Sequence, residues 1–255
     1  MSAPVFLADA SVAHPLAGYA PGSVYVLDGA EGRHAGVVQR RGPGERIDVV
    51  DGAGVRLRTV VESVDGAGVH LRVEDVEVEP EPAVVVTLVQ ALAKGDRDEM
   101  AIEAATEVGA DAVLPWQAER SVVVWRGDRA ARSRARWVST VRAATKQARR
   151  ARMPSVGTAL STKQLAARAR EVVEAGGVVT VLHEEASTPL ADVPLPEAGE
   201  LLVVVGPEGG ISDGEVAALT EAGAVTARLG PHVLRTSTAG PVAIALLSAR
   251  LGRWS

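Results

Sequence analysis

Short apolar runs separated by glycine-rich turns make up the first third of the chain. Runs of alternating or β-branched residues at Val24–Leu27, Ile47–Val50, Val55–Val61 and Val69–Val78 are typical of β-strands. The glycines between them supply the positive φ angles that tight turns need. The pattern predicts a small antiparallel β-barrel over residues 1–78.

The pattern changes after a stiff connector with the sequence Glu79-Pro80-Glu81-Pro82. Proline donates no N–H and restricts the residue before it, so this stretch favours neither a helix nor a strand pairing. We therefore predict a linker at residues 79–83 and a second domain at residues 84–255.

In the second domain, apolar strands alternate with amphipathic helices, which is typical of an α/β sheet covered on both faces. The predicted strands are Val84–Leu92, Val178–Leu182, Leu201–Val205 and Val225–Leu229. The predicted helix starts share capping-box spacing, at Asp96/Glu99, Ser161/Gln164 and Ser212/Glu215.

Two further helical patterns bear on function. In the first capped helix, Met100, Ala104 and Val108 are spaced to form one buried stripe. The last helix, predicted over Val242–Leu251, is apolar on nearly every side until Arg250. Such a helix is buried either in its own fold or against a partner chain, and the pattern leaves both open.

Composition excludes several classes of protein. The chain is 47% hydrophobic and 23% charged, as in an ordinary globular protein. It has no cysteine, which excludes disulfides, thiolate metal sites and thiol nucleophiles. Its five histidines stand far apart, so we expect no metal.

The longest uncharged stretch, Ala10–Leu27, contains two prolines, which rules against a bilayer span. The N-terminus has no basic region of the kind that opens a secretory signal, and we expect a cytoplasmic protein.

Positive charge is concentrated in one segment. Residues 126–152 hold ten basic residues against one acid, a charge of +9, so a net charge of −5 leaves −14 for the rest of the chain. Such a segment indicates either a contact surface for phosphates or a solvated helix face. Its apolar residues Trp137, Val141 and Ala144 predict a helix with one buried face.

Two glycine-containing loops follow predicted strands near the C-terminus, at 206–210 and 229–240. The carboxyl edge of an open α/β sheet is where such folds bind ligands, and glycine lets backbone groups approach a nucleotide-like ligand closely. Ordinary strand-to-helix turns are the alternative. The chain has no P-loop, no G-x-G-x-x-G, no G-x-S-x-G and no H-E-x-x-H motif.

The segments LLVVVGPEGGIS (201–212) and LGPHVLRTSTAG (229–240) strongly resemble the two C-terminal motifs of the RsmE family, in the SPOUT superfamily of knotted methyltransferases. The likeness extends to residues 33–40 and 51–52, similar to the family's N-terminal barrel. It includes residues 103–109, 119–121 and 147–154, similar to its central signatures. The combination of these motifs, in this order across two domains, is what makes the likeness specific.

The resemblance implies a PUA-like RNA-binding barrel followed by a parallel sheet whose last segment threads a deep trefoil knot. It implies methylation of N3 of a uridine in 16S ribosomal RNA, with S-adenosylmethionine as donor, by a homodimer that acts on the small ribosomal subunit. The implied donor-binding residues are Leu182, Val205, Gly206, Pro207, Gly209, Gly210, Leu229, Gly230, Val233, Leu234, Thr236, Thr238 and Ala239.

Four residues are candidates for the chemistry. Arg235 has the donors to stabilise negative charge on a uracil oxygen, or it locks the loop through a salt bridge. Glu208 is a candidate base or an anchor for loop amides. Many relatives have glutamate where this chain has Ser237, whose hydroxyl is suited to bind a uracil carbonyl or, with Thr238, to cap the last helix. His183 is a candidate proton relay or a structural histidine.

The candidate RNA-binding residues are all cationic: Arg33, Arg40, Arg41, Arg120, Arg126, Arg142, Lys146, Arg149, Arg150 and Arg152. For Arg120 a buried ion pair is equally compatible. Trp116 and Trp125 either stack on bases or belong to the core. Two alternative functions stay open, namely a non-catalytic RNA-binding protein and a methyltransferase of the same superfamily that acts on another RNA.

Overall fold

The structure is a computed structural model that describes residues 3–8 and 15–254. Residues 10–14 of the uncharged stretch Ala10–Leu27 therefore lie outside the described residues. The chain forms two compact units. Unit 1 comprises Met1–Glu81 and Thr145–Met153, and unit 2 comprises Pro82–Ala144 and Pro154–Ser255.

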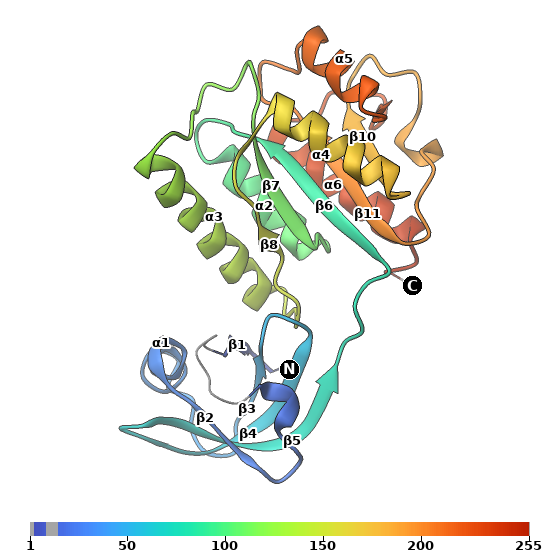
Figure 1. Cartoon of the computed structure of the whole chain (residues 1–255). Coiled ribbons are helices and arrows are strands. Elements are labelled where there is room, and N and C mark those ends of the chain that lie inside the picture. Colours follow the sequence, from blue (N-terminus) through green and yellow to red (C-terminus); the bar gives the residue numbers. More distant parts are fainter. Residues whose placement is uncertain (1–2, 9–14, 255) are drawn as a thin grey trace. The chain divides into compact units, whose positions relative to one another are not determined.

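Unit 1 is built on a five-stranded sheet with the order β1-β3-β4-β5-β2 (Figure 1). Its strands are β1 (Val5–Leu7), β2 (Val24–Leu27), β3 (Arg46–Val50), β4 (Val55–Asp65) and β5 (Gly68–Val78). Alternate residues of these strands, with Phe6, Leu27, Ile47, Leu57 and Leu71 among them, form an apolar core.

The expected all-antiparallel arrangement is wrong in one respect, because β1 pairs in parallel with β3. A strand of three residues is too short to show a period, so no pattern in the sequence predicts it. Between β2 and β3 the chain forms a short helix, α1 (Gly29–Arg33), that continues into a π-helical turn, η2 (His34–Val38). A 3-10 turn, η1 (Leu16–Gly18), precedes β2.

Unit 2 contains a seven-stranded sheet in which every pairing is parallel. Its order is β12-β10-β11-β6-β7-β8, and β9 also pairs with β7. The strands are β6 (Val84–Ala91), β7 (Ala112–Gln117), β8 (Ser155–Val156), β9 (Leu160–Ser161), β10 (Val178–Leu182), β11 (Gly199–Val205) and β12 (Val225–Ala227). This confirms the α/β class with a parallel sheet.

Helices cover both faces of this sheet (Figure 1). One face carries α4 (Thr162–Glu174) and α5 (Asp213–Glu221), and the other carries α2 (Arg97–Glu107) and α6 (Thr236–Arg250). The remaining elements are α3 (Asp128–Gln147), whose last residues belong to unit 1, and the 3-10 turn η3 (Leu190–Asp192).

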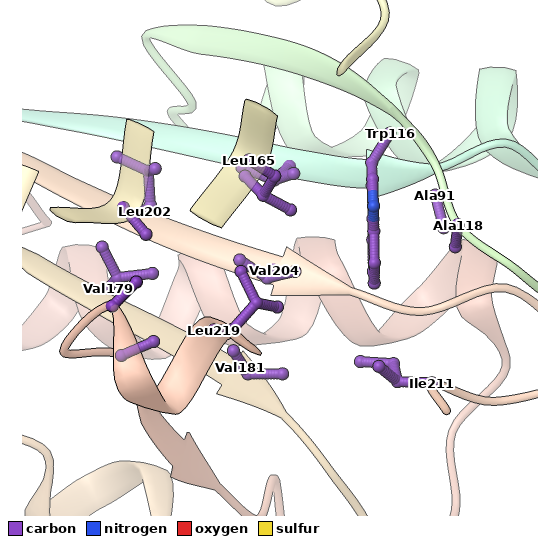
Figure 2. Packing of buried hydrophobic residues seen from close by; sticks show 14 of the residues in the cluster. Ala91, Trp116, Ala118, Leu165, Val179, Val181, Leu202, Val204, Ile211 and Leu219 are labelled. Carbon is purple, nitrogen blue, oxygen red and sulfur yellow. The ribbon is translucent and has the colours of Figure 1, made fainter. Parts of the chain in front are cut away.

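Side chains alternate across β11 as its period of two requires. Leu202 and Val204 pack with Leu165 of α4 and Leu219 of α5 (Figure 2). Trp116 at the end of β7 is fully buried in the same cluster, so it belongs to the core and does not stack on RNA bases.

The capping boxes predicted for α4 and α5 are confirmed, since in each the serine accepts from the third residue and that residue's side chain accepts from the serine N–H. The box predicted for α2 is wrong. Asp96 has a φ of 60° and its side chain makes no capping bond. The predicted stripe is wrong too, because Met100 is 57% exposed while α2 buries Ala101, Ile102 and Ala105.

The last helix starts six residues earlier than predicted, at Thr236, and includes Pro241. Proline removes one helical hydrogen bond and normally marks a boundary. Burial compensates here, because Pro241 is buried and Gly240 lies against β6 and β11, where a Cβ on Gly240 would stand 2.8 Å from Leu88 Cδ1.

No helix among the described residues is long and apolar enough to cross a membrane.

Candidate functional site

A pocket of about 800 Å³ opens at the carboxyl ends of β10, β11 and β12, all in unit 2. Three stretches of chain line most of it, at residues 182–185, 205–211 and 228–236. All of the predicted donor-binding residues except Thr238 line this pocket, as do Arg235 and Glu208. Ser237 and Thr238 lie in the first turn of α6, outside the lining.

The first loop, residues 206–212, joins β11 to α5 in a tight turn. Gly210 has a φ of 75°, a conformation that side chains rarely adopt. A Cβ on Gly206 would stand 2.6 Å from Ile211 Cγ1, so only glycine fits beside the buried isoleucine. We call these residues the 206–212 loop.

Hydrogen bonds hold the start of the 206–212 loop to neighbouring elements. The Thr236 hydroxyl donates to the Gly206 carbonyl over 2.7 Å. Gln90, at the end of β6, donates from Nε2 to Thr236 Oγ1 over 2.8 Å. The Arg120 guanidinium donates to the Gly209 carbonyl over 3.0 Å. Arg120 is thus a partner of the loop backbone and is not in a buried ion pair.

Glu208 is held by the start of α2 and by the loop before it. Its Oε1 accepts from Arg97 Nη1 over 2.7 Å. Burial raises the pKa of Glu208, but hydrogen bonds from its own N–H, from Arg97 and from the Lys94 N–H outweigh burial, so its net pKa is lowered. A carboxylate with a lowered pKa is a poor proton acceptor, and the geometry therefore favours the anchoring role.

The second loop, residues 228–235, joins β12 to α6. Arg235 is the N-cap residue of α6, where no side chain caps the helix. The capping role considered for Ser237 and Thr238 is therefore not the one these residues have. Arg228 and Arg235 are exposed in the pocket, and neither makes a side-chain hydrogen bond or ion pair with the described residues.

The pocket carries charged side chains of both signs. Its arginines are Arg97, Arg120, Arg228 and Arg235, its carboxylates are Glu184, Glu185, Glu208 and Asp213, and His183 and His232 line it as well. The Nδ1 atom of His183 accepts from the Glu185 N–H over 3.3 Å. This bond ties the ring to the backbone two residues away, which favours the structural role for this histidine. Within residues 3–8 and 15–254, no group of three or more potential ligands is arranged to hold a metal.

The arginine-rich helix α3 buries Trp137, Val141 and Ala144, as its pattern predicts. Trp125, just before it, stacks edge-on against Trp137 with the ring centroids 5.2 Å apart. The arginines of this segment fall into two groups, those whose side chains bind another part of the described chain and those whose side chains do not. Arg134 donates to the Val156 and Gly157 carbonyls, and Arg136 pairs with Asp96 and Glu99.

By contrast, Arg126, Arg129 and Arg132 are exposed and have no side-chain partner within the part of the chain that the structure describes. Arg142 is not free, because it takes part in a further interaction.

In unit 1, several predicted RNA-binding residues have structural partners. Lys146 donates to both carboxylate oxygens of Glu31, at 3.0 and 2.8 Å, and Arg41 pairs with Glu45. Arg152 donates to the Glu79 carbonyl.

Arg150 is not free, since it too takes part in a further interaction. Arg33, Arg40 and Arg149 are exposed, and their side chains have no partner among the described residues of unit 1.

Sequence reasoning missed Arg97, Arg228 and Gln90, although each follows or ends a strand of the parallel sheet. The rule that ligands bind at the carboxyl edge would have included them, had β6 and β12 been treated like β11.

Comparison with known proteins places the chain in a family. The sequence profile of an RNA methyltransferase domain matches residues 79–248. The chain is 51% identical to the ribosomal RNA small subunit methyltransferase E of Mycobacterium bovis, over 91% of this chain and 89% of that one. It is 33% identical to the protein of the same name from Bacillus subtilis, over 88% and 89%.

A solved structure agrees with these relatives. The ribosomal RNA small subunit methyltransferase E of Neisseria gonorrhoeae, bound to S-adenosyl methionine, superposes with a TM-score of 0.82 at 26% identity and covers 98% of each chain. From its profile, its relatives and its fold, the chain belongs to the ribosomal RNA small subunit methyltransferase E family.

Proposed function

We propose that this protein transfers a methyl group from S-adenosylmethionine to N3 of one uridine in 16S ribosomal RNA, in the cytoplasm. The observation that carries this proposal is the pocket lined by the 206–212 loop and residues 228–235, with Arg235 inside it. The N. gonorrhoeae relative binds S-adenosyl methionine in the same fold, which supports the choice of donor.

The residues of the pocket fit such a donor. Its volume of about 800 Å³ lies in the range of ligand pockets and exceeds what a small metabolite needs. Gly206, Gly209, Gly210 and Gly230 bring backbone groups to its wall without obstruction, and Leu182, Val205 and Leu234 supply apolar surface for a purine ring. When bound, the donor supplies a methyl group on a positively charged sulfur that leaves as a neutral thioether.

Arg235 has the properties that charge stabilisation requires. Methylation of uridine N3 forms an N–C bond, and the N3 proton is lost to solvent. As that proton leaves, negative charge builds up on the neighbouring carbonyl oxygens. An exposed guanidinium without a protein partner is free to donate two hydrogen bonds to such an oxygen. The competing role, a salt bridge that locks the loop, lacks a partner among the described residues.

Glu208 and Ser237 have supporting roles in this proposal. Glu208 anchors the 206–212 loop through Arg97 rather than removing the proton. Ser237 lies outside the pocket lining but next to Thr236, which lines it. Its hydroxyl makes no hydrogen bond with the described residues and is available to a uracil carbonyl of the bound RNA.

RNA contacts are assigned to exposed cations without protein partners. These are Arg126, Arg129 and Arg132 in unit 2, and Arg33, Arg40 and Arg149 in unit 1. We assign the PUA-like RNA-binding role to residues 1–78 and the methyltransferase role to residues 84–255. The target uridine leaves its base stack to enter the pocket.

Topology supports two further parts of the proposal, a trefoil knot and a homodimer. The chain leaves β12 at the edge of the sheet and returns to its middle, where α6 packs on β6 and β11. That return passes the 206–212 loop, as threading would require. Helices α2 and α6 pack together and each exposes a large apolar residue, Met100 and Leu246, which suits an interface.

The test is to incubate the protein with tritiated S-adenosylmethionine and small ribosomal subunits, digest the RNA and identify the labelled nucleoside. We expect 3-methyluridine at one position of 16S RNA. Label in another nucleoside or another RNA would support a different methyltransferase activity, and RNA binding without transfer would support a non-catalytic protein. Either result overturns the proposal.

A further inference from the structure

Glu215 is a buried carboxylate for which the reaction has no use. It stands at the third position of α5, only 4% exposed, and its side chain points back to the 206–212 loop. A capping box needs one of its oxygens, and that oxygen, Oε2, accepts from the Ser212 N–H over 3.1 Å. The other oxygen has different partners.

Those partners come from two distant segments. Glu215 Oε1 accepts from the Glu119 N–H over 2.8 Å and from the Thr162 hydroxyl over 2.7 Å. One carboxylate therefore joins the 206–212 loop to the segment after β7 and to the start of α4. We call this meeting of three segments the junction. Burying the Glu215 carboxylate without these donors would cost free energy. All three segments are therefore held to this side chain.

A second carboxylate strengthens the same junction. The Ser212 hydroxyl lies 2.7 Å from Glu119 Oε2 and 3.2 Å from Glu215 Oε2. It has one proton to donate, and the shorter distance assigns that proton to Glu119. The end of the 206–212 loop is thus held by two carboxylates, while its start is held by Thr236.

Arg120 extends the junction into the middle of the loop. It follows Glu119 directly, and its guanidinium donates to the Gly209 carbonyl. A Cβ on Gly209 would stand 3.1 Å from the Arg120 Cβ, so the two backbones are already close. The contacts that hold Glu119 therefore also hold the adjoining backbone of Arg120, whose side chain reaches Gly209.

The same segment leads to α3. Gln117 accepts from the Trp125 N–H and donates to the Val123 carbonyl, which closes residues 117–125 into a compact loop. Trp125 then packs on Trp137 of α3. An unbroken series of contacts runs from the arginine-rich helix to the 206–212 loop.

We propose that Glu215 and Arg120 are positioning residues, which hold the 206–212 loop in the shape that binds the methyl donor before the donor arrives. Arg120 acts on the loop and not on RNA. The inference rests on the proposed donor, S-adenosylmethionine, but the shape of the loop is measurable without it.

The first test compares Glu215→Gln with Glu221→Gln, a matched change at an exposed position on the same helix. Glutamine keeps the size of the side chain but has one acceptor oxygen, so either the Ser212 N–H or the Glu119 and Thr162 donors lose their acceptor. In the ligand-free protein we expect hydrogen exchange of residues 206–212 to be faster in Glu215→Gln only, with exchange in β6 and β11 unchanged.

Donor affinity is the second readout, measured by calorimetry with S-adenosylmethionine and S-adenosylhomocysteine. If the loop keeps its binding shape in roughly one molecule in ten, the apparent Kd rises about tenfold. Arg120→Ala tests the surface part of the junction with little risk to folding. It should raise the donor Kd in the absence of RNA, and Arg120→Lys should restore part of the affinity.

Equal exchange and equal donor Kd in Glu215→Gln and Glu221→Gln would overturn the inference. So would an Arg120→Ala protein that binds donor normally and loses RNA affinity. Faster exchange throughout unit 2 would show that Glu215 serves only the fold, and would overturn it too. If the wild-type protein takes up neither ligand, the proposed function fails, while the exchange comparison still decides the positioning role.

Discussion

At the scale of single residues, a charged side chain in this protein is assigned a role by the partner it has. Glu208 and Arg97 occupy each other in the pocket wall, whereas Arg235 stands in the same pocket with no partner among the described residues. The ion pair of Glu208 and Arg97 holds the pocket wall in shape. The lone guanidinium is available to a substrate.

The proposed role of Arg235 predicts a selective kinetic defect. Arg235→Ala should lower kcat by about a hundredfold, the usual loss when one charge-stabilising donor is removed. The donor Kd should change little, because the residues proposed to bind the donor, with the neighbouring Leu234 and Thr236 among them, do not include the Arg235 side chain. Single-turnover methylation of small subunits and calorimetry would measure the two effects. A large rise in donor Kd with an unchanged rate would assign Arg235 to donor binding instead.

Asp98 predicts a pH dependence of stability. It lies in the first turn of α2, 6% exposed, and burial raises its pKa from 3.8 to about 6 despite hydrogen bonds from the Glu99 and Ala93 N–H groups. Between those values the folded protein keeps a proton that the unfolded chain has lost. The contribution of this group to the free energy of unfolding therefore falls as pH rises from about 4 to about 6, by roughly 3 kcal/mol in total.

Asp98→Asn has no such titration. The free energy of unfolding of the variant should thus gain on that of the wild type as pH rises through this window, and stay level above it. Urea unfolding at several pH values would measure the difference. A constant difference across the window would mean that Asp98 titrates at its ordinary pKa in the folded protein.

At the scale of elements, local signals were reliable where one turn of chain decides the outcome. The serine capping boxes of α4 and α5 formed as their spacing predicts, because serine reaches its own helix start regardless of the rest of the fold. The Asp96/Glu99 spacing failed because the preceding loop needs a left-handed residue at Asp96. That need comes from the path of the loop, which spacing does not encode.

Tertiary packing determines the elements that the local sequence pattern predicted wrongly. The last helix was predicted to start at Val242, yet it starts at Thr236 and includes Pro241, because Gly240 allows its first turns to lie close to Leu88 and Val205. The two glycine-containing loops were visible in the sequence, and their residues line one pocket. The pairing of these loops with Gln90 and Arg97 was not visible, since each partner lies more than a hundred residues away in the chain.

The division of arginines on α3 leads to a prediction about RNA binding. Reversing the charge at Arg129 and Arg132 should weaken RNA affinity and reduce its salt dependence by about one phosphate contact for each arginine. Donor binding should be unaffected. Arg134→Ala, on the same helix, should instead lower the free energy of unfolding because the Val156 and Gly157 carbonyls lose their donor.

Titrations of a 16S RNA fragment at several salt concentrations, with thermal unfolding alongside, would separate the two groups. Unchanged RNA affinity after reversal at Arg129 and Arg132 would show that this face of α3 is only solvated.

At the scale of the whole molecule, the chain is acidic overall and its two units are built on different sheets. The linker pattern and the change of period predict two domains, at residues 1–78 and 84–255. The inclusion of Thr145–Met153 in unit 1 was not anticipated, because a helix pattern gives no sign of where its last turn packs. A knot and a dimer likewise depend on contacts that no local pattern describes.

The proposed homodimer gives the last prediction. Leu246 on α6 is 50% exposed, in a helix that is otherwise largely apolar and buried. An isolated exposed leucine is unremarkable, but Met100 on the adjoining α2 is exposed as well, and a shared interface would remove both from water. Leu246→Glu would place a carboxylate in that interface, so we expect the sedimentation of a monomer where the wild type sediments as a dimer. Val78→Glu, a matched change at an exposed valine of unit 1, should leave the dimer intact. If the Leu246→Glu variant is still a dimer, the interface lies on another surface. If the wild type is a monomer, the proposed homodimer is wrong.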